Sequence, residues 1–167
     1  MAIRTIVKVG DDILNKKCRP VTDFNDRLFT LLEDMHDTLT DAHGAGLAAP
    51  QVGILRRLAL VMVEDESFLE IINPEIIARE GEQDGAEGCL SVPGKYGTVA
   101  RPDYVKVRAQ NRNGEFFEVE GEGIVARCFC HELEHLDGHI FVERVIGPLY
   151  TPEELDEIMS AGEEEEA

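Results

Sequence analysis

His131-Glu132-Leu133-Glu134-His135 is the stretch that decides the fold and the chemistry of this chain. It lies within residues 124–137, where apolar positions recur at helical spacing, and Gly138 follows as the expected stop. Four residues along a helix advance about 6 Å and turn about 40°, so both imidazoles project from one face and can bind one metal ion. Glu132 is rotated about 100° from His131. It is therefore predicted to lie beside the ion, as the base that deprotonates a metal-bound water.

A catalytic metal site needs a third protein ligand and an open position for water. The metzincin pattern would place a third histidine at position 141, but that residue is Phe141, which excludes that family. A thermolysin-type site would take a later glutamate, and Glu153, Glu154 or Glu157 lies at a plausible distance along the chain. Glu154 is also predicted to cap the start of a short C-terminal helix, a role that needs no metal. The glutamate alternative stays open at this point.

The cysteines offer another third ligand. Cys128 shares the helix face of the two histidines, but three ligands on consecutive turns would span about 10 Å, too far for a short thiol. Cys130 is about 100° off that face. We therefore interpret Cys128 and Cys130 as core residues. Cys89 remains, in the segment Glu87-Gly88-Cys89-Leu90-Ser91 before Pro93, where a strand or tight turn could offer a thiolate.

Length and composition indicate a single domain, and the order of its predicted helices and strands indicates an α+β fold. The chain has 167 residues, of which 43% are apolar, enough to bury one sizeable core. An amphipathic helix is predicted over residues 24–43, with Gly44 as its left-handed stop. Strands are predicted at 58–63, 69–72, 98–100, 104–108 and 115–119, with Asn113-Gly114 as a hairpin turn. No connection between them is long enough for a crossover helix, so we expect small antiparallel or mixed sheets around the central helix that carries the histidines.

The C-terminal residues form an acidic appendage. Residues 151–167 carry eight of the 34 acidic residues and no base, while the chain as a whole has a formal charge of −18. Thr151, Pro152 and Glu154 predict the start of a short helix with a capping box. We therefore divide the chain into a catalytic domain, residues 1–150, and a short helix with a solvated acidic tail, residues 151–167.

Charge and hydropathy also predict where the chain works. The negative charge opposes binding to nucleic acid or to an anionic membrane. The longest apolar run, residues 58–63, is far short of the roughly 20 residues that span a bilayer, and charges interrupt any signal sequence near the N-terminus. We expect a cytoplasmic protein with reduced thiols.

Three motifs, in order, resemble those of peptide deformylase. They are Gly44-Ala45-Gly46-Leu47-Ala48-Ala49-Pro50-Gln51, Glu87-Gly88-Cys89-Leu90-Ser91 and His131-Glu132-Leu133-Glu134-His135-Leu136-Asp137-Gly138. The resemblance covers roughly residues 3–145. It implies removal of the N-formyl group from the initiator methionine of newly made proteins, with release of formate.

The resemblance also implies a role for each matched residue. Cys89, His131 and His135 would hold the metal, water would be the fourth ligand, and Glu132 would be the catalytic base and acid. The side-chain amide of Gln51 and the backbone N–H of Leu90 would stabilise the oxyanion. The extended peptide would bind along two glycine-rich segments, and the methionine pocket would lie near the ligand helix. These substrate-binding positions are Gly44, Ala45, Gly46, Gly88 and Cys128.

The resemblance implies one divalent metal ion per chain and a peptide partner. The ion is commonly Fe²⁺ in the family, and Ni²⁺, Co²⁺ or Zn²⁺ can occupy the site. The partners would be formyl-methionine peptides and nascent chains, with transient proximity to the ribosome and no specific binding to nucleic acid or membrane. The alternatives are a thermolysin-like metallopeptidase and a structural zinc protein that adds a ligand such as Cys128.

Overall fold

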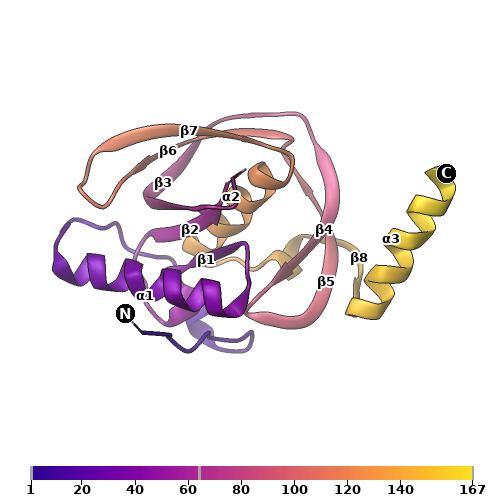
Figure 1. Cartoon of the computed structure of the whole chain (residues 1–167), viewed down its shortest axis with the longest axis horizontal. Helices are drawn as coiled ribbons and strands as arrows, with labels where there is room; N and C mark the ends of the chain where they lie inside the picture. The colour runs from indigo at the N-terminus through magenta and orange to yellow at the C-terminus, as the bar shows by residue number, and fades with distance from the viewer. Residues whose placement is uncertain (1, 64, 167) are drawn as a thin grey trace.

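The structure, a computed structural model, describes residues 2–63 and 65–166, the last six by their backbone alone. It has an α+β fold in which two antiparallel sheets surround one central helix, α2 (Gly123–Leu136) (Figure 1). The larger sheet has the order β1-β2-β3-β6-β7, formed by Gly46–Ala48, Leu58–Met62, Phe68–Glu80, Tyr104–Gln110 and Phe116–Glu122. The smaller sheet has the order β4-β5-β8, formed by Gln83–Cys89, Val92–Arg101 and Val145–Tyr150. The predicted fold class is confirmed.

The larger sheet is covered on both faces at β2, which explains the unbroken apolar sequence of that strand. Successive strand side chains point to opposite faces. Leu58 and Leu60 pack with α1 (Asp26–Ala42), whereas Ala59 and Val61 pack with α2. The stripe predicted over residues 24–43 is this first helix. The site-bearing helix is thus held in the hydrophobic core of the sheet.

Glycine conformations at the helix ends differ from the prediction in one place. The left-handed residue that closes α1 is His43 (φ 55°), not Gly44. Gly44 instead packs closely, since a Cβ there would lie 2.8 Å from Leu90 Cδ1. Gly138 (φ 84°) closes α2 as predicted.

The strands differ more from the sequence-based boundaries. The strand predicted at 69–72 extends in the structure to Glu80. Asn73 (φ 51°) interrupts its regular pairing with β6, the register shifts there, and the strand then resumes. At the hairpin, Gly114 has the positive φ, and Asn111 accepts hydrogen bonds from its loop neighbours. Strands β1, β4 and β8 were not predicted.

The C-terminal helix α3 (Pro152–Glu166) is longer than the short helix expected. Its start is as predicted, with Thr151 Oγ1 accepting a hydrogen bond from the Glu154 N–H (3.2 Å). Figure 1 shows it at the edge of the molecule, apart from α2. The acidic side chains of residues 163–166 lie outside the described residues, so the solvated tail stays a prediction.

An ion cluster ties α1 to the larger sheet. Glu70 of β3 pairs with His36 of α1 (2.8 Å) and accepts a hydrogen bond from Arg112 Nε (3.0 Å). Burial opposes the charge of Glu70, but these partners outweigh it and lower the pKa of Glu70 to about 2. The carboxylate therefore stabilises the fold in its ionised form.

Glu70→Gln is expected to lower the free energy of unfolding at neutral pH by about 1–3 kcal/mol. Because the pKa is lower in the folded than in the unfolded chain, this stabilisation is complete above pH 4.5 and is lost as the pH falls towards about 2. Urea denaturation at about pH 7 and about pH 3 measures the difference between variant and wild type. Glu118→Gln, from an exposed pair with Lys106, is the control. If Glu70→Gln lowered the free energy of unfolding equally at both pH values, the stabilisation would not come from the ionised Glu70 carboxylate.

Candidate functional site

Three potential metal ligands meet where β4 ends against α2. Cys89 is the last residue of β4, and His131 and His135 lie one turn apart on α2. One ligand atom from each residue lies within 4.8 Å of the others. Cys89 Sγ is 3.3 Å from His135 Nε2. The structure therefore brings together the two histidines of the helix and the cysteine that lies more than 40 residues earlier.

The electrostatic surroundings of this cluster suit a divalent cation. Burial lowers the pKa of His135 to about 3, which keeps its imidazole neutral and able to ligate. Burial alone would also lower the pKa of His131, but Glu132, Cys89 and Glu87 face it and raise that pKa. A sulfur and two imidazoles are donors that borderline transition metals accept. The donor set and the negative surroundings both fit such an ion.

Glu132 lies beside the cluster without being part of it. Its side chain is buried, and within the described residues Oε1 has no hydrogen-bond partner. Burial raises the pKa of Glu132 to about 7. A carboxyl group with a pKa near neutrality can both accept and return a proton. The geometry thus provides an acid/base group next to the candidate ligands.

The cluster opens onto a cavity of about 510 Å³. Its floor includes His131 and Glu132. All of the substrate-binding positions suggested by the sequence line it, namely Gly44, Ala45, Gly46, Gly88 and Cys128, and so does Leu90. An open cavity distinguishes this cluster from a closed structural site, which leaves no position for water.

Gln51 is placed differently from the other predicted residues. Its Nε2 donates to Cys89 Sγ (3.4 Å) and Ser91 Oγ (3.1 Å), and its Oε1 accepts from the Ala48 N–H (2.9 Å). It is buried and, among the described residues, is not one that lines the cavity. The amide therefore lies directly against the Cys89 thiol, held in a fixed orientation.

The residues of the alternative sites lie elsewhere. Glu153, Glu154 and Glu157 are on α3, and Glu154 accepts a hydrogen bond from Thr151 Oγ1. Cys128 lines the cavity, and burial raises its thiol pKa to about 12, so it stays protonated at neutral pH. Within the described residues, the ligand cluster contains none of these side chains.

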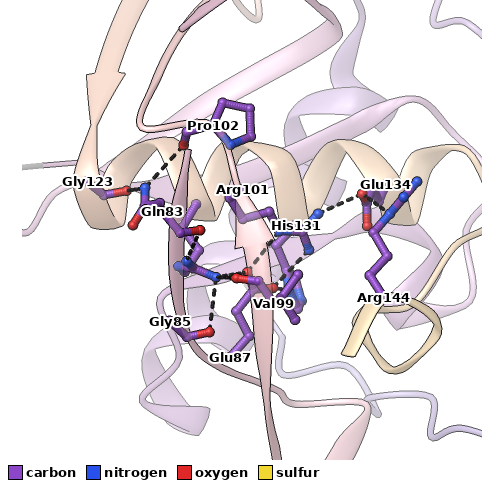
Figure 2. Close-up of polar contacts among 11 residues, drawn as sticks. Gln83, Gly85, Glu87, Val99, Arg101, Pro102, Gly123, His131, Glu134 and Arg144 are labelled. Carbon is purple, nitrogen blue, oxygen red and sulfur yellow. Dashed lines mark hydrogen bonds and ion pairs between the residues drawn. The ribbon is translucent and has the colours of Figure 1, made fainter. Parts of the chain in front are cut away.

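Sequence reasoning missed the group that supports His131. Figure 2 shows the Glu87 carboxylate between His131 and Arg101, with Glu134 farther along α2, where Arg144 approaches it from the segment after the helix. Glu87 Oε1 is 2.8 Å from His131 Nδ1, and the carboxylate accepts hydrogen bonds from Arg101 (2.8 and 2.9 Å) and Arg127 (2.6 Å). Burial opposes the charge of Glu87, but Arg101 and His131 outweigh it and lower the pKa of Glu87 to about 2. An ionised carboxylate on Nδ1 fixes the ring so that Nε2 faces the cluster.

A usable signal for Glu87 was its spacing from Cys89. Residues two apart in a strand share a face, so both side chains point to the same side of β4. The identity of the partners, Arg101 and Arg127, depends on how the sheet packs against α2 and has no local signal.

Glu87→Gln is expected to weaken metal affinity by about 10–100-fold. The amide cannot hold His131 Nδ1–H as a carboxylate does, and Arg101 and Arg127 lose a buried counter-charge. Titration of the metal-free protein against a chelating competitor measures the change. Glu118→Gln removes an exposed carboxylate and should leave the affinity unchanged. Equal affinity in Glu87→Gln and wild type would show that the buried carboxylate does not support the site.

Comparison with known proteins identifies the family of the chain. The polypeptide deformylase family profile matches residues 3–148. The chain belongs to the peptide deformylase family. Members of this family are metal-dependent hydrolases that remove the N-formyl group from nascent peptides.

Individual deformylases match over nearly the whole chain. The peptide deformylase of Lachnoclostridium phytofermentans is 52% identical over 168 residues, which cover 99% of both chains. That of Agathobacter rectalis is 54% identical over 150 residues, or 90% of this chain and 94% of the relative. The crystal structure of peptide deformylase from Thermotoga maritima superposes with a TM-score of 0.85 at 38% identity, covering 88% of this chain and all of that one.

Proposed function

We propose that Cys89, His131 and His135 hold one divalent ion, and that this chain uses the site to hydrolyse the formyl group of N-terminal formyl-methionine, releasing formate. The observation that carries the proposal is the convergence of three ligand atoms within 4.8 Å, with Glu132 beside them, at the floor of an open cavity. Bound there, the ion would act as a Lewis acid that lowers the pKa of a water molecule and polarises the formyl oxygen.

Glu132 moves the proton in this proposal. Its carboxylate takes a proton from the attacking water and later gives it to the leaving nitrogen of methionine. The pKa of about 7 supports both roles, because the group is neither a strong acid nor a strong base at neutral pH. Its burial also keeps other water away from the carboxylate.

Gln51 and Leu90 stabilise the developing oxyanion. Gln51 Nε2 already lies 3.4 Å from Cys89 Sγ, and Leu90 directly follows Cys89 in the turn between β4 and β5. Both groups are uncharged donors in a fixed frame, so little reorganisation is needed when charge develops on the formyl oxygen. The proposal requires the Gln51 amide to exchange one present contact for the oxyanion.

The substrate peptide binds as an added strand. Strand β1 is at one edge of the larger sheet and β4 is at one edge of the smaller sheet. The cavity is lined by residues at both edges, including Gly46 and Gly88. A free edge presents backbone donors and acceptors that an extended peptide can pair with. The methionine side chain would then enter the space near Ala45 and Cys128.

Gly46→Ala is expected to lower kcat by about 10²-fold with little loss of metal. A Cβ at this position would overlap the Glu132 carboxylate, with Glu132 Cδ only 2.9 Å away, so the acid/base group would be displaced. Steady-state kinetics and metal analysis of the purified variant test this. Wild-type kcat in a variant of unchanged metal content would show that the position of Glu132 is not critical.

The remaining assignments belong to the same proposal. Fe²⁺ is the proposed native ion, with Ni²⁺, Co²⁺ or Zn²⁺ as substitutes. Residues 1–150 would form the catalytic domain and residues 151–167 an acidic appendage, consistent with a family match that ends at residue 148. We place the enzyme in the cytoplasm, in transient proximity to the ribosome. Within the described residues, the helices are too short or too polar to cross a membrane.

Product analysis separates this function from its alternatives. A short formyl-Met peptide should lose only its formyl group, with one formate released per new amino terminus and all peptide bonds intact. Internal cleavage would support the metallopeptidase. No product from the fully metallated protein would support the structural zinc site.

A further inference from the structure

The mouth of the substrate cavity differs in charge from the rest of the molecule. The chain carries a formal charge of −18. Among the described residues that line the cavity, the acidic ones are Glu87 and Glu132, and both are buried. The exposed charged residues of the lining are two lysines, Lys8 and Lys95. Both exposed charged side chains of this lining are therefore positive.

Backbone contacts hold Lys8 at this position. The Val7 N–H donates to the Gln51 carbonyl (2.7 Å), and the Val9 N–H donates to the Ser91 carbonyl (2.7 Å). These bonds fasten the N-terminal segment beside the turn that follows Cys89. Lys8 Nζ donates to the Leu90 carbonyl (3.2 Å), and an ammonium group has two further hydrogens to offer. The cation is thus fixed next to the residue proposed to bind the formyl oxygen.

Lys95 adds a second cation from a different element. It lies on β5, directly after Gly94, whose positive φ (74°) changes the direction of the backbone at this point. Lys95 is exposed and lines the same cavity. The neighbouring Tyr96 ring packs over Gly88, where a Cβ would lie 2.5 Å from Tyr96 Cε1. Cationic side chains from two segments far apart in the sequence therefore line the same cavity, which also includes residues of the β4 edge.

We propose that Lys8 and Lys95 determine specificity, favouring formyl-Met substrates that carry an acidic side chain at the second or third position. This inference rests on the proposed deformylase function. Methionine fills the cavity near Cys128, so the residues that follow it must leave through the mouth. There an acidic side chain meets two cations, whereas a basic one meets like charge. Without the lysines, the negative charge of the whole protein would repel acidic substrates.

The test compares three formyl-Met tripeptide amides with Glu, Ala or Lys at the second position. A parallel set varies the third position, and the C-terminal amides remove the peptide carboxylate as a competing anion. For wild type we expect kcat/KM to be about threefold to tenfold higher for the Glu than for the Lys peptide at one of the two positions. Raising the salt from about 0.1 to about 1 M shortens the Debye length from about 10 Å to about 3 Å and should reduce this ratio.

Variants separate recognition from a structural role. In Lys8→Gln/Lys95→Gln the Glu to Lys ratio should fall to about one, whereas Lys8→Arg/Lys95→Arg should keep it. Lys17→Ala, an exposed lysine away from the cavity lining, should also keep it. If Lys8 only fastens the N-terminal segment, the glutamine variant will slow all three peptides equally and the ratio will persist, which overturns the proposal. Equal rates for all peptides with wild type also overturn it, while failure to deformylate any peptide refutes the function itself.

Discussion

Glu132→Gln is expected to lower kcat for formyl-Met peptide hydrolysis by about 10³-fold or more while the metal content stays at that of the wild type. The carboxylate is the buried acid/base group beside the ligand cluster, with a pKa of about 7, and glutamine can neither accept nor return the proton. Glutamine has nearly the same shape, so packing against Gly46 should persist. Kinetics and metal analysis on the same preparation measure both quantities.

The control for this variant is another glutamate on α2. Glu134 lies on the opposite side of the helix, paired with Arg101 and Arg144, as Figure 2 shows. Glu134→Gln should retain most of the activity, because Glu134 lies outside the substrate cavity lining and Arg101 keeps its two hydrogen bonds to Glu87. A Glu132→Gln variant that keeps its metal and most of its kcat would mean that another group moves the proton.

Cys89→Ala is expected to abolish activity through loss of the metal. Removal of one of three ligands should weaken affinity by more than the about 10–100-fold that follows loss of a supporting group. The variant should still fold, because Cys89 is only a partly buried neighbour of one core cluster, whose fully buried side chains, such as Val99 and Phe141, remain. Metal analysis after anaerobic purification, with circular dichroism to monitor the fold, gives the result.

Cys128→Ala is the matched cysteine control. It should retain the metal, since Cys128 lies outside the ligand cluster of the described residues. Metal retained in Cys89→Ala would favour a site completed by a glutamate, as in the thermolysin-like alternative. Metal lost in Cys128→Ala would favour the closed structural site.

Sequence reasoning found the elements whose patterns are local. Helix α2 combines apolar periodicity with the histidine spacing, and α1 shows an amphipathic stripe, so the ends of both were predicted to within two residues. The hairpin around Asn113-Gly114 was found because its turn residues are specific. In these segments the local sequence favours the same conformation that the tertiary packing requires.

The missed strands depend on tertiary pairing. Strand β4 reads Gln-Asp-Gly-Ala-Glu-Gly-Cys, which contains no β-branched or aromatic residue, and it forms because β5 pairs along its length. The same holds for the support of His131, since Glu87, Arg101 and Arg127 come from three elements. The left-handed residue after α1 is His43 rather than Gly44, which packs too closely against Leu90 and Leu39 to carry a side chain.

The most direct test of the account is the rate of formate release from a formyl-Met peptide as a function of bound metal per chain. Metal-free protein would be prepared anaerobically and reloaded with Fe²⁺, and both quantities measured on each sample. We expect no release without metal, a rate that rises in proportion to bound ion, and a plateau at one ion per chain. Full activity in the metal-free protein, or a fully loaded protein that releases no formate, would contradict it.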